Sequence, residues 1–229
     1  DWEDGLMDAS LDTNIIIHLY NANYQSILFD RFEKVKVYEF IRNHEMENHA
    51  SSEVIELFDK DVQAGKIELI TYDYFKSIGM HNVFNSHVRQ LSILFEKGDL
   101  GEVYAIAMAK ILGCITLVTN DIKEYGPHYT LMRIPDSDII PLSFYEILFL
   151  NYMEGLITEE KLMEQFDTIC SVSGLHMNFS SKLYTFIRRF WDSPYTESEK
   201  LWMNSFCSIN NINAKQKMWK LREYLKKKR

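Results

Sequence analysis

A buried helix that leads into a buried strand decides the fold of this chain. It reads Glu102-Val103-Tyr104-Ala105-Ile106-Ala107-Met108-Ala109-Lys110-Ile111-Leu112-Gly113-Cys114-Ile115-Thr116-Leu117-Val118. Residues 102–112 are apolar on nearly every side, which is typical of a helix enclosed by the core, and Gly113 suits its C-terminal end. Residues 114–118 form an almost continuous apolar run, as expected of a strand covered on both faces. This pair of elements indicates a parallel sheet.

The alternation of strand and helix extends toward the N-terminus. Strand patterns alternate there with helical patterns, the strands at 5–11, 35–38 and 67–71 and the helices at 13–22, 39–65 and 74–97. Such alternation predicts an α/β fold with a parallel sheet flanked by helices. Beyond the last buried strand, Pro127, Pro135 and Pro141 punctuate the chain, and we expect one edge strand around Leu131–Ile134.

From residue 143 onward the patterns are helical only. Helices are expected over 143–153, from Thr158 to about Ser171, along the apolar stripe 183–191, after a capping box at Thr196-Glu197-Ser198-Glu199, and over 214–227. We therefore predict two domains, an α/β domain over 1–150 and an all-helical C-terminal extension over 151–229 that ends in a basic tail.

Composition limits the classes of protein that fit. The chain has 229 residues, 46% of them hydrophobic, which is enough for a substantial core. It has no apolar run of the roughly 20 residues that cross a membrane, and the acidic start Asp1-Trp2-Glu3-Asp4 is unlike a signal peptide.

The three cysteines of the chain have no zinc or disulfide spacing, so we expect reduced thiols and a cytoplasmic location. The net charge is −8, but residues 215–229 hold eight bases and one acid, which could contact phosphates or simply favour a helix C-terminus.

Acidic residues stand where predicted strands end or helices begin. Asp12 follows the first strand, Asp121 follows the strand at 114–118, and Glu102 opens the buried helix. The carboxyl ends of parallel strands meet at one edge of a sheet, which is where α/β proteins bind ligands. Each residue also has an ordinary interpretation, as an N-cap, a turn residue or a helix-dipole glutamate. Asp8 competes with Asp12, and the accessory candidates are Asn14, Asp99, Thr119 and Asn120.

A fourth carboxylate is expected on the helix after the second strand. Four glutamates compete there: Glu39, Glu45, Glu47 and Glu53. Glu45 lies one turn beyond the apolar Ile41, so we choose Glu45, with Glu47 as the next candidate. His44 and His49 lie beside Glu45 in the sequence, although no histidine forms a recognised metal-binding motif.

Carboxylates gathered at one edge would repel one another unless a cation lay between them. Mg²⁺ prefers oxygen ligands and keeps some of its waters, so a few carboxylates and a substrate phosphate suffice to hold it. One or two such ions can activate water and stabilise the leaving oxygen of a phosphodiester. The pattern of Asp12, Glu45, Glu102 and Asp121 therefore favours a metal-dependent hydrolase that cuts phosphodiester bonds.

The same residues carry a resemblance to a known family. Leu11-Asp12-Thr13-Asn14-Ile15-Ile16-Ile17, Gly98-Asp99-Leu100-Gly101-Glu102 and Leu117-Val118-Thr119-Asn120-Asp121 resemble the motifs of PIN domains, in particular the VapC-like toxin ribonucleases. The resemblance covers about residues 5–150. It implies a Rossmann-like sheet, one or two Mg²⁺ or Mn²⁺ ions, and endonucleolytic cleavage of single-stranded RNA. It assigns the metal-binding and catalytic roles to Asp12, Glu102 and Asp121, and more loosely to Glu45. It also implies a homodimer and an antitoxin partner.

The helical extension departs from the toxin group, whose members are often little more than the PIN domain. A ribonuclease in another defence or RNA-processing setting is one alternative. A second is a catalytically inactive PIN-fold scaffold that binds protein or RNA through the extension, where aromatic residues are frequent. A phosphatase with Asp12 as nucleophile fits less well, because that chemistry usually needs a second aspartate where Asn14 stands.

Overall fold

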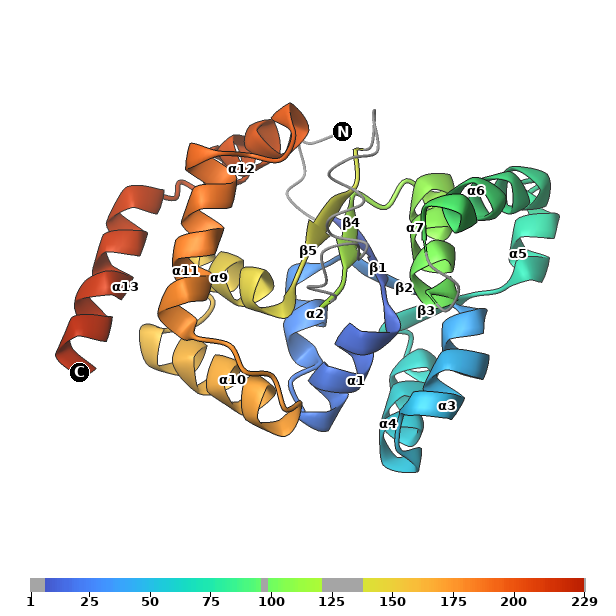
Figure 1. Cartoon of the computed structure of the whole chain (residues 1–229), viewed down its shortest axis with the longest axis horizontal. Coiled ribbons are helices and arrows are strands. Elements are labelled where there is room, and N and C mark those ends of the chain that lie inside the picture. Colours follow the sequence, from blue (N-terminus) through green and yellow to red (C-terminus); the bar gives the residue numbers. More distant parts are fainter. Residues whose placement is uncertain (1–6, 96–98, 121–137, 229) are drawn as a thin grey trace. The chain divides into compact units, whose positions relative to one another are not determined.

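The computed structural model describes residues 7–95, 99–120 and 138–228. The chain divides into two compact units, Leu6–Phe144 and Tyr145–Arg229, which we call the sheet unit and the helical unit. The division falls at the start of helix α9 (Phe144–Glu154), whereas the boundary drawn from the sequence lies after residue 150. The two units are described separately (Figure 1).

The sheet unit contains a five-stranded parallel sheet with the order β3-β2-β1-β4-β5. The strands are β1 (Asp8–Leu11), β2 (Lys34–Tyr38), β3 (Ile67–Ile70), β4 (Thr116–Val118) and β5 (Ile140–Leu142). The predicted α/β, Rossmann-like fold is confirmed. The chain runs outward from β1 through β2 to β3 and then returns to β4 on the other side of β1. The boundary between β1 and β4 is therefore the topological switch point of the sheet.

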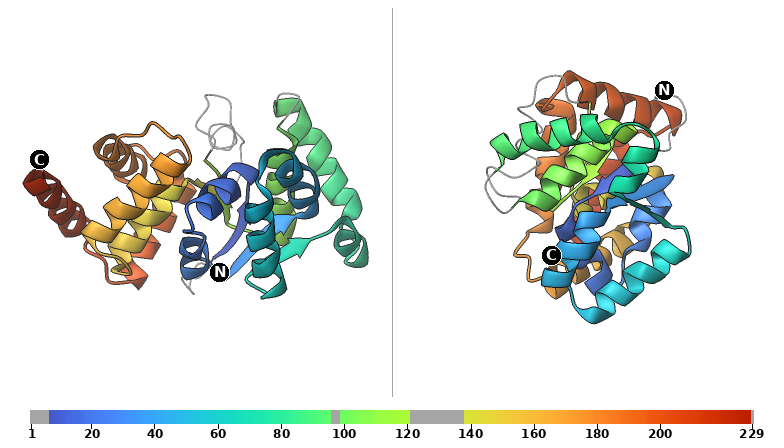
Figure 2. Two further views of the ribbon diagram at one scale, coloured as in Figure 1. Left: turned by 90° about the horizontal axis from the view of Figure 1, so that it is seen from below. Right: turned by 90° about the vertical axis from the view of Figure 1, so that its right-hand side faces the viewer.

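Helices cover both faces of this sheet. One layer contains α1 (Thr13–Asn21), α2 (Ser26–Arg31) and α4 (Ser52–Gln63), and the other contains α6 (His81–Leu94) and α7 (Leu100–Leu112), as Figure 2 shows. Shorter helical pieces are η2 (Ile41–Glu45), α3 (Met46–His49) and α5 (Tyr72–Ser77). As predicted, α7 is buried almost throughout, and Gly113 ends it in the left-handed conformation with φ +67°. The core thus surrounds α7 and the central strands β1 and β4.

The fifth strand is the main difference from the sequence-based reading of this unit. The sequence predicts no strand at residues 140–142, which follow a segment interrupted by prolines. In the structure these residues form β5, next to β4. The N–H of Ile140 donates to Ile115 O at 2.7 Å, and the N–H of Thr119 donates to Leu142 O at 2.9 Å. Pro141 lies between the two residues of β5 that make these hydrogen bonds. Proline has no N–H to donate, but at this position of an edge strand no N–H is needed. The edge strand predicted around Leu131–Ile134 lies outside the described residues.

The helical unit consists of successive helices around an aromatic core. They are α9, α10 (Glu159–Val172), α11 (Phe179–Ile187), η3 (Arg188–Asp192), α12 (Glu197–Ile209) and α13 (Ala214–Lys228), close to the ranges predicted. Phe149 packs against Phe186 and Phe179 with ring centroids 5.1 and 5.5 Å apart, and Phe190 packs against Trp202. Among the aromatic residues of the C-terminal extension, Phe186, Phe190 and Trp202 are buried in this core. Trp219 and Tyr184, by contrast, are 63% and 61% exposed. In the part of the chain that the structure describes, no helix is long and apolar enough to cross a membrane.

A buried arginine holds two glutamates in the centre of the helical unit. The guanidinium of Arg189 donates to Glu146 at 2.7 Å and also to Glu199, and all three side chains are almost fully enclosed. Burial disfavours the charge of Arg189, but the two carboxylates raise its pKa above the ordinary value. Glu199 also belongs to the predicted capping box, in which its N–H donates to Thr196 Oγ1 at 3.1 Å. The cap and the ion cluster together fix the start of α12.

Candidate active site at the carboxyl edge of the sheet

The candidate site begins at the switch point, where β1 and β4 end side by side. Asp12 is the first residue after β1, and Thr119 and Asn120 follow β4. The N–H of Asp12 donates to Val118 O at 3.0 Å, which locks the two strand ends together. Because ligands of open α/β sheets bind beyond the carboxyl ends of the strands at such a point, this edge is the expected position of a binding site.

Asp12 is buried at this edge, with 1% of its surface exposed. Its carboxylate accepts from the N–H of Thr13 at 2.5 Å and from the Thr119 hydroxyl at 3.1 Å. Both donors are neutral, and together they fix the orientation of the carboxyl group. The competing candidate Asp8 lies at the opposite end of β1 and pairs with Lys36. Geometry therefore places Asp12, and not Asp8, at the carboxyl edge.

Helix α7 brings Glu102 to the same edge. The Ser10 hydroxyl donates to Ala105 O at 2.9 Å, so the middle of β1 packs against α7 one turn beyond Glu102. At the helix start, a Cβ built on Gly101 would lie 3.1 Å from Thr13 Oγ1. These two contacts show that α7 runs antiparallel to β1 and that its first turn lies beside the residue that follows Asp12. Glu102 is buried there, at 8% exposure.

Gly101 also reveals the position of Glu45. The same built Cβ would lie 3.4 Å from Glu45 Cγ and 3.7 Å from Glu45 Cδ. A methyl group at position 101 would therefore press on Thr13 Oγ1 and touch Glu45 at van der Waals distance. The absence of a Cβ lets the end of η2 and the start of α1 approach the first turn of α7 closely. Asp12, Glu45 and Glu102 thus come from three elements that meet around Gly101.

The other glutamates proposed for the fourth position are engaged elsewhere. Glu39 accepts from the N–H of Tyr72 at 2.7 Å, at the start of α5. Glu47 pairs with Arg42 at 2.6 Å and its side chain is 53% exposed. Glu53 is exposed in the first turn of α4. Of the four candidates, Glu45 is the one whose side chain borders Gly101.

Local contacts explain why the segment that carries Glu45 sits where it does. Residues 41–45 form a single π-helical turn, in which the N–H of Met46 reaches back to Ile41 O. Arg42 ties this turn to α4 through two bonds to Asp59, at 2.6 and 2.7 Å. Phe40 packs against Tyr104 of α7 with ring centroids 4.7 Å apart. The turn is therefore held between α4 and α7 by these contacts. Next to it, His49 Nε2 lies 3.8 Å from Glu45 Oε2.

The accessory candidates are distributed around this edge. Asn14 is exposed in the first turn of α1, and Asp99 is the N-cap residue of α7, where its side chain makes no capping hydrogen bond. Asn120 Oδ1 accepts from the N–H of Phe144 at 3.1 Å, which fixes the amide. Among the described residues, Asn120 Nδ2 and Thr13 Oγ1 are buried without a hydrogen-bond partner. The sequence reasoning overlooked Thr13, although a hydroxyl beside an acid at a strand end was a usable signal.

The remaining predicted ligand, Asp121, lies outside the described residues. Within residues 7–95, 99–120 and 138–228, no three or more Asp, Glu, His or Cys side chains are grouped closely enough to hold a metal ion. The groups at the edge are nonetheless of one chemical kind, because carboxylate, hydroxyl and amide oxygens are the ligands of hard cations. Burial raises the pKa of the Cys114, Cys170 and Cys207 thiols to about 11, which favours their protonated form at neutral pH.

Comparisons of this chain with protein-family models, with curated proteins and with solved structures find no match. The resemblance to PIN domains therefore rests on the three sequence motifs, and the activity that it implies remains a prediction.

Proposed function

We propose that the carboxyl edge of the sheet is the active site of a ribonuclease that uses one or two Mg²⁺ or Mn²⁺ ions. The close approach at Gly101 carries this proposal, because it brings the elements of Asp12, Glu45 and Glu102 together beside the end of β4. Asp121 follows β4 directly after Thr119 and Asn120. Four acids that are remote in the sequence are thus assigned to one edge, at the switch point where α/β sheets bind ligands.

The ligand chemistry of Mg²⁺ fits a site of this kind. Mg²⁺ is usually held by one or two carboxylates together with substrate phosphates and retained waters, so a cage of three protein carboxylates is not required. The Thr13 N–H and the Thr119 hydroxyl orient the Asp12 carboxylate, as hydrogen bonds to metal-binding carboxylates commonly do. The hydroxyl of Thr13 is buried beside Gly101 and has no partner among the described residues, so it has an unused hydrogen bond at the same edge.

In this assignment the four carboxylates would hold the ions, in part through the waters that Mg²⁺ retains, and would not attack the substrate. When bound, such ions activate water and stabilise the charge on the leaving oxygen of a phosphodiester. The chain itself supplies the orientation of Asp12, through Thr119, and the close contact of Glu45 with the start of α7. The N-termini of α1 and α7 lie at this edge, where their backbone N–H groups favour an anion such as phosphate.

Single-stranded RNA as substrate is the proposal that the PIN resemblance adds. A role as the toxin of a toxin–antitoxin pair, with a homodimer, has the same support, whereas the proposed cytoplasmic location rests on the absence of zinc or disulfide spacing among the three cysteines. An inactive scaffold makes the opposite prediction for metal binding, since it has no need of an ion at the sheet edge. Metal binding and RNA cleavage are therefore the measurements that separate the two functions.

The test is a pair of isosteric variants on neighbouring glutamates. With fluorescently labelled single-stranded RNA and Mn²⁺, we expect cleavage by the wild-type protein and none after EDTA. Glu45→Gln should lower the rate by about 10²-fold, whereas Glu47→Gln, two residues away and pointing elsewhere, should keep it near wild type.

Asp12→Asn should abolish cleavage while the melting temperature stays close to that of the wild type, and it should weaken Mn²⁺ binding in calorimetry. A folded wild-type protein that neither binds Mn²⁺ nor cuts RNA would overturn the proposal and favour the scaffold. Equal activity of the Glu45→Gln and Glu47→Gln variants would remove Glu45 from the site.

A further inference from the structure

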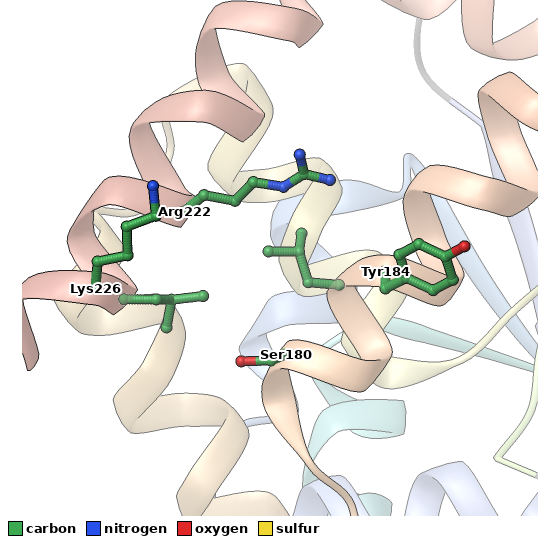
Figure 3. Close-up of a pocket in the computed structure, with 6 residues that line it drawn as sticks. Ser180, Tyr184, Arg222 and Lys226 are labelled. Carbon is green, nitrogen blue, oxygen red and sulfur yellow. The ribbon is translucent and has the colours of Figure 1, made fainter. Parts of the chain in front are cut away.

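A groove runs along the helical unit between α11–η3 and α13. Its first half is a hollow of about 340 Å³, and Figure 3 shows Ser180 and Tyr184 of α11 opposite Arg222 and Lys226 of α13. Its second half, of about 350 Å³, lies between the end of α11 and the start of α13 and shares Arg222 with the first. The two hollows therefore adjoin at Arg222, and we call them together the α11–α13 groove.

Helix α13 is fixed on the side away from this groove. The Tyr152 hydroxyl donates to Lys217 O at 3.2 Å, and Lys220 pairs with Glu159 at 3.0 Å. Leu221 is fully buried in the same packing. Because α13 is held through these contacts to α9 and α10, the groove is a stable feature of the unit. The part of α13 that lines it, Ala214 to Lys226, is about 18 Å long at 1.5 Å per residue.

The floor and the rim of the groove differ in chemistry. The floor is built from apolar side chains, which are Leu183, Ile187, Trp191, Met218 and Leu225. The rim carries Lys215, Arg222 and Lys226, and none of the described lining residues is acidic. Lys226 already pairs with Glu223, but among the described residues neither Lys215 nor Arg222 has an ion-pair partner. The groove thus offers an apolar strip bordered by unpaired positive charge.

We propose that the α11–α13 groove binds an acidic amphipathic helix of a protein partner. A helix about three turns long would place apolar side chains at i, i+4 and i+7 on the floor, the usual mode of helix-in-groove recognition. Its carboxylates would meet Arg222 and Lys215, which gives the charge complementarity that selects a partner. Exposed Trp219 at the rim would cover the bound helix, as aromatic residues often do at interfaces.

Single-stranded RNA fits this groove less well than a helix does. The basic rim would attract phosphates, and Trp219 could stack on a base. The floor, however, is mainly apolar, and the Ser180 and Tyr184 hydroxyls and the Trp191 N–H are few hydrogen-bonding groups for the edges of several bases, so most bases that entered it would leave polar atoms unpaired. This inference stands on the helical unit alone and is independent of any cleavage at the sheet.

Three probes test the proposal on the full-length protein by fluorescence anisotropy. The first is a labelled helical peptide of about 18 residues with leucines at i, i+4 and i+7 and glutamates on its other faces. The second keeps the leucines and replaces every glutamate by lysine, and the third is a labelled single-stranded RNA. We expect saturable binding of the acidic peptide with a change in tryptophan emission, and binding of the basic peptide at least about tenfold weaker.

Charge-reversal variants locate the binding site. Arg222→Glu should weaken binding of the acidic peptide by about tenfold or more, and Trp219→Ala by about fivefold. Lys227→Glu is the matched control, because Lys227 is exposed on the same helix but does not line the groove, and it should change the affinity by less than about twofold. No binding of the acidic peptide, equal loss in the Arg222→Glu and Lys227→Glu variants, or RNA binding at Arg222 in its place would each overturn the proposal.

Discussion

Buried carboxylates occur in both units of this protein, in different surroundings. In the helical unit, Glu146 and Glu199 are bound by the guanidinium of Arg189, and this cluster lies inside the aromatic core. In the sheet unit, Asp12 and Glu102 lie at the carboxyl edge of the strands, and Asp12 accepts from a hydroxyl and a backbone N–H. Burial of an acid therefore does not by itself indicate a function. Its position in the topology, inside the core of the helical unit or at the carboxyl edge of the parallel strands, is what distinguishes a structural cluster from a candidate site.

The largest effect is expected from removing the cation of the structural cluster. Arg189→Met should lower the free energy of unfolding of the helical unit by about 3–5 kcal/mol, because it leaves two buried carboxylates without their cation. In a Trp2→Phe background, urea unfolding followed by the emission of Trp191, Trp202 and Trp219 measures this unit, since these three tryptophans lie in it. By contrast, Asp12→Asn should hardly change stability. A loss below about 1 kcal/mol in Arg189→Met would contradict the structural role of the cluster.

The next prediction concerns the close approach at the candidate site. Gly101→Ala places a methyl group 3.1 Å from Thr13 Oγ1, so the Thr13 side chain must shift by a few tenths of an ångström, and brings the same methyl group into van der Waals contact with Glu45 Cγ at 3.4 Å. Alanine favours a helix over glycine by about 1 kcal/mol, which offsets part of the steric cost to folding. RNA cleavage should nevertheless fall by about tenfold, since small displacements of catalytic groups are costly. Cleavage at the wild-type rate would show that this approach does not constrain the site.

The sequence predicted most of the fold because its strongest signals are local. The apolar run at 114–118 and the apolar helix before it predicted the centre of the sheet unit, although only Thr116–Val118 of that run form β4. The strand at 140–142 was overlooked because Pro141 argues against a strand unless the strand is known to lie at an edge. The Arg189 cluster was overlooked for a related reason: its partners are remote in the sequence, and no local pattern marks them.

The candidate site was predictable to a similar extent. Asp12 and Glu102 occupy the edge expected from their places after a strand and at a helix start. The choice of Glu45 over its neighbours depended on one apolar residue, whereas its position in the structure depends on a π-helical turn and on Arg42. A π-helical turn adds a residue to the helical repeat, so a face derived from a period of 3.6 does not predict it. The role of Thr13 depends on Gly101, a tertiary contact that the sequence does not show.

A smaller effect is expected from Thr13, and it should have opposite signs for stability and activity. Thr13→Val replaces a buried hydroxyl that has no partner among the described residues by a methyl group of similar shape. Stability should stay equal or rise by up to about 1 kcal/mol, because an unpaired polar atom is removed. RNA cleavage should fall by about threefold to tenfold if the hydroxyl contacts a phosphate or a metal-bound water. Thermal unfolding and cleavage rates measured on one preparation give both signs, and a parallel loss of both would assign Thr13 a structural role alone.

The smallest effect is a difference in acid sensitivity between the two units. Burial lowers the pKa of His18, in α1, below its ordinary 6.5, so protonation of His18 opposes folding. The contribution of neutral His18 to stability is complete above pH 6.5 and is lost as the pH falls through the lower pKa of the folded state.

In the helical unit, burial opposes the charge of Glu159, but its hydrogen bonds and Lys220 lower its pKa below 4.5. That contribution is complete above pH 4.5 and is lost only below it. Stability of the sheet unit should therefore begin to fall at a higher pH than stability of the helical unit, as measured by circular dichroism and tryptophan emission during acid titration. His18→Gln should reduce this difference without removing it, because His87 of α6, whose pKa is lowered by burial and by Lys110, remains.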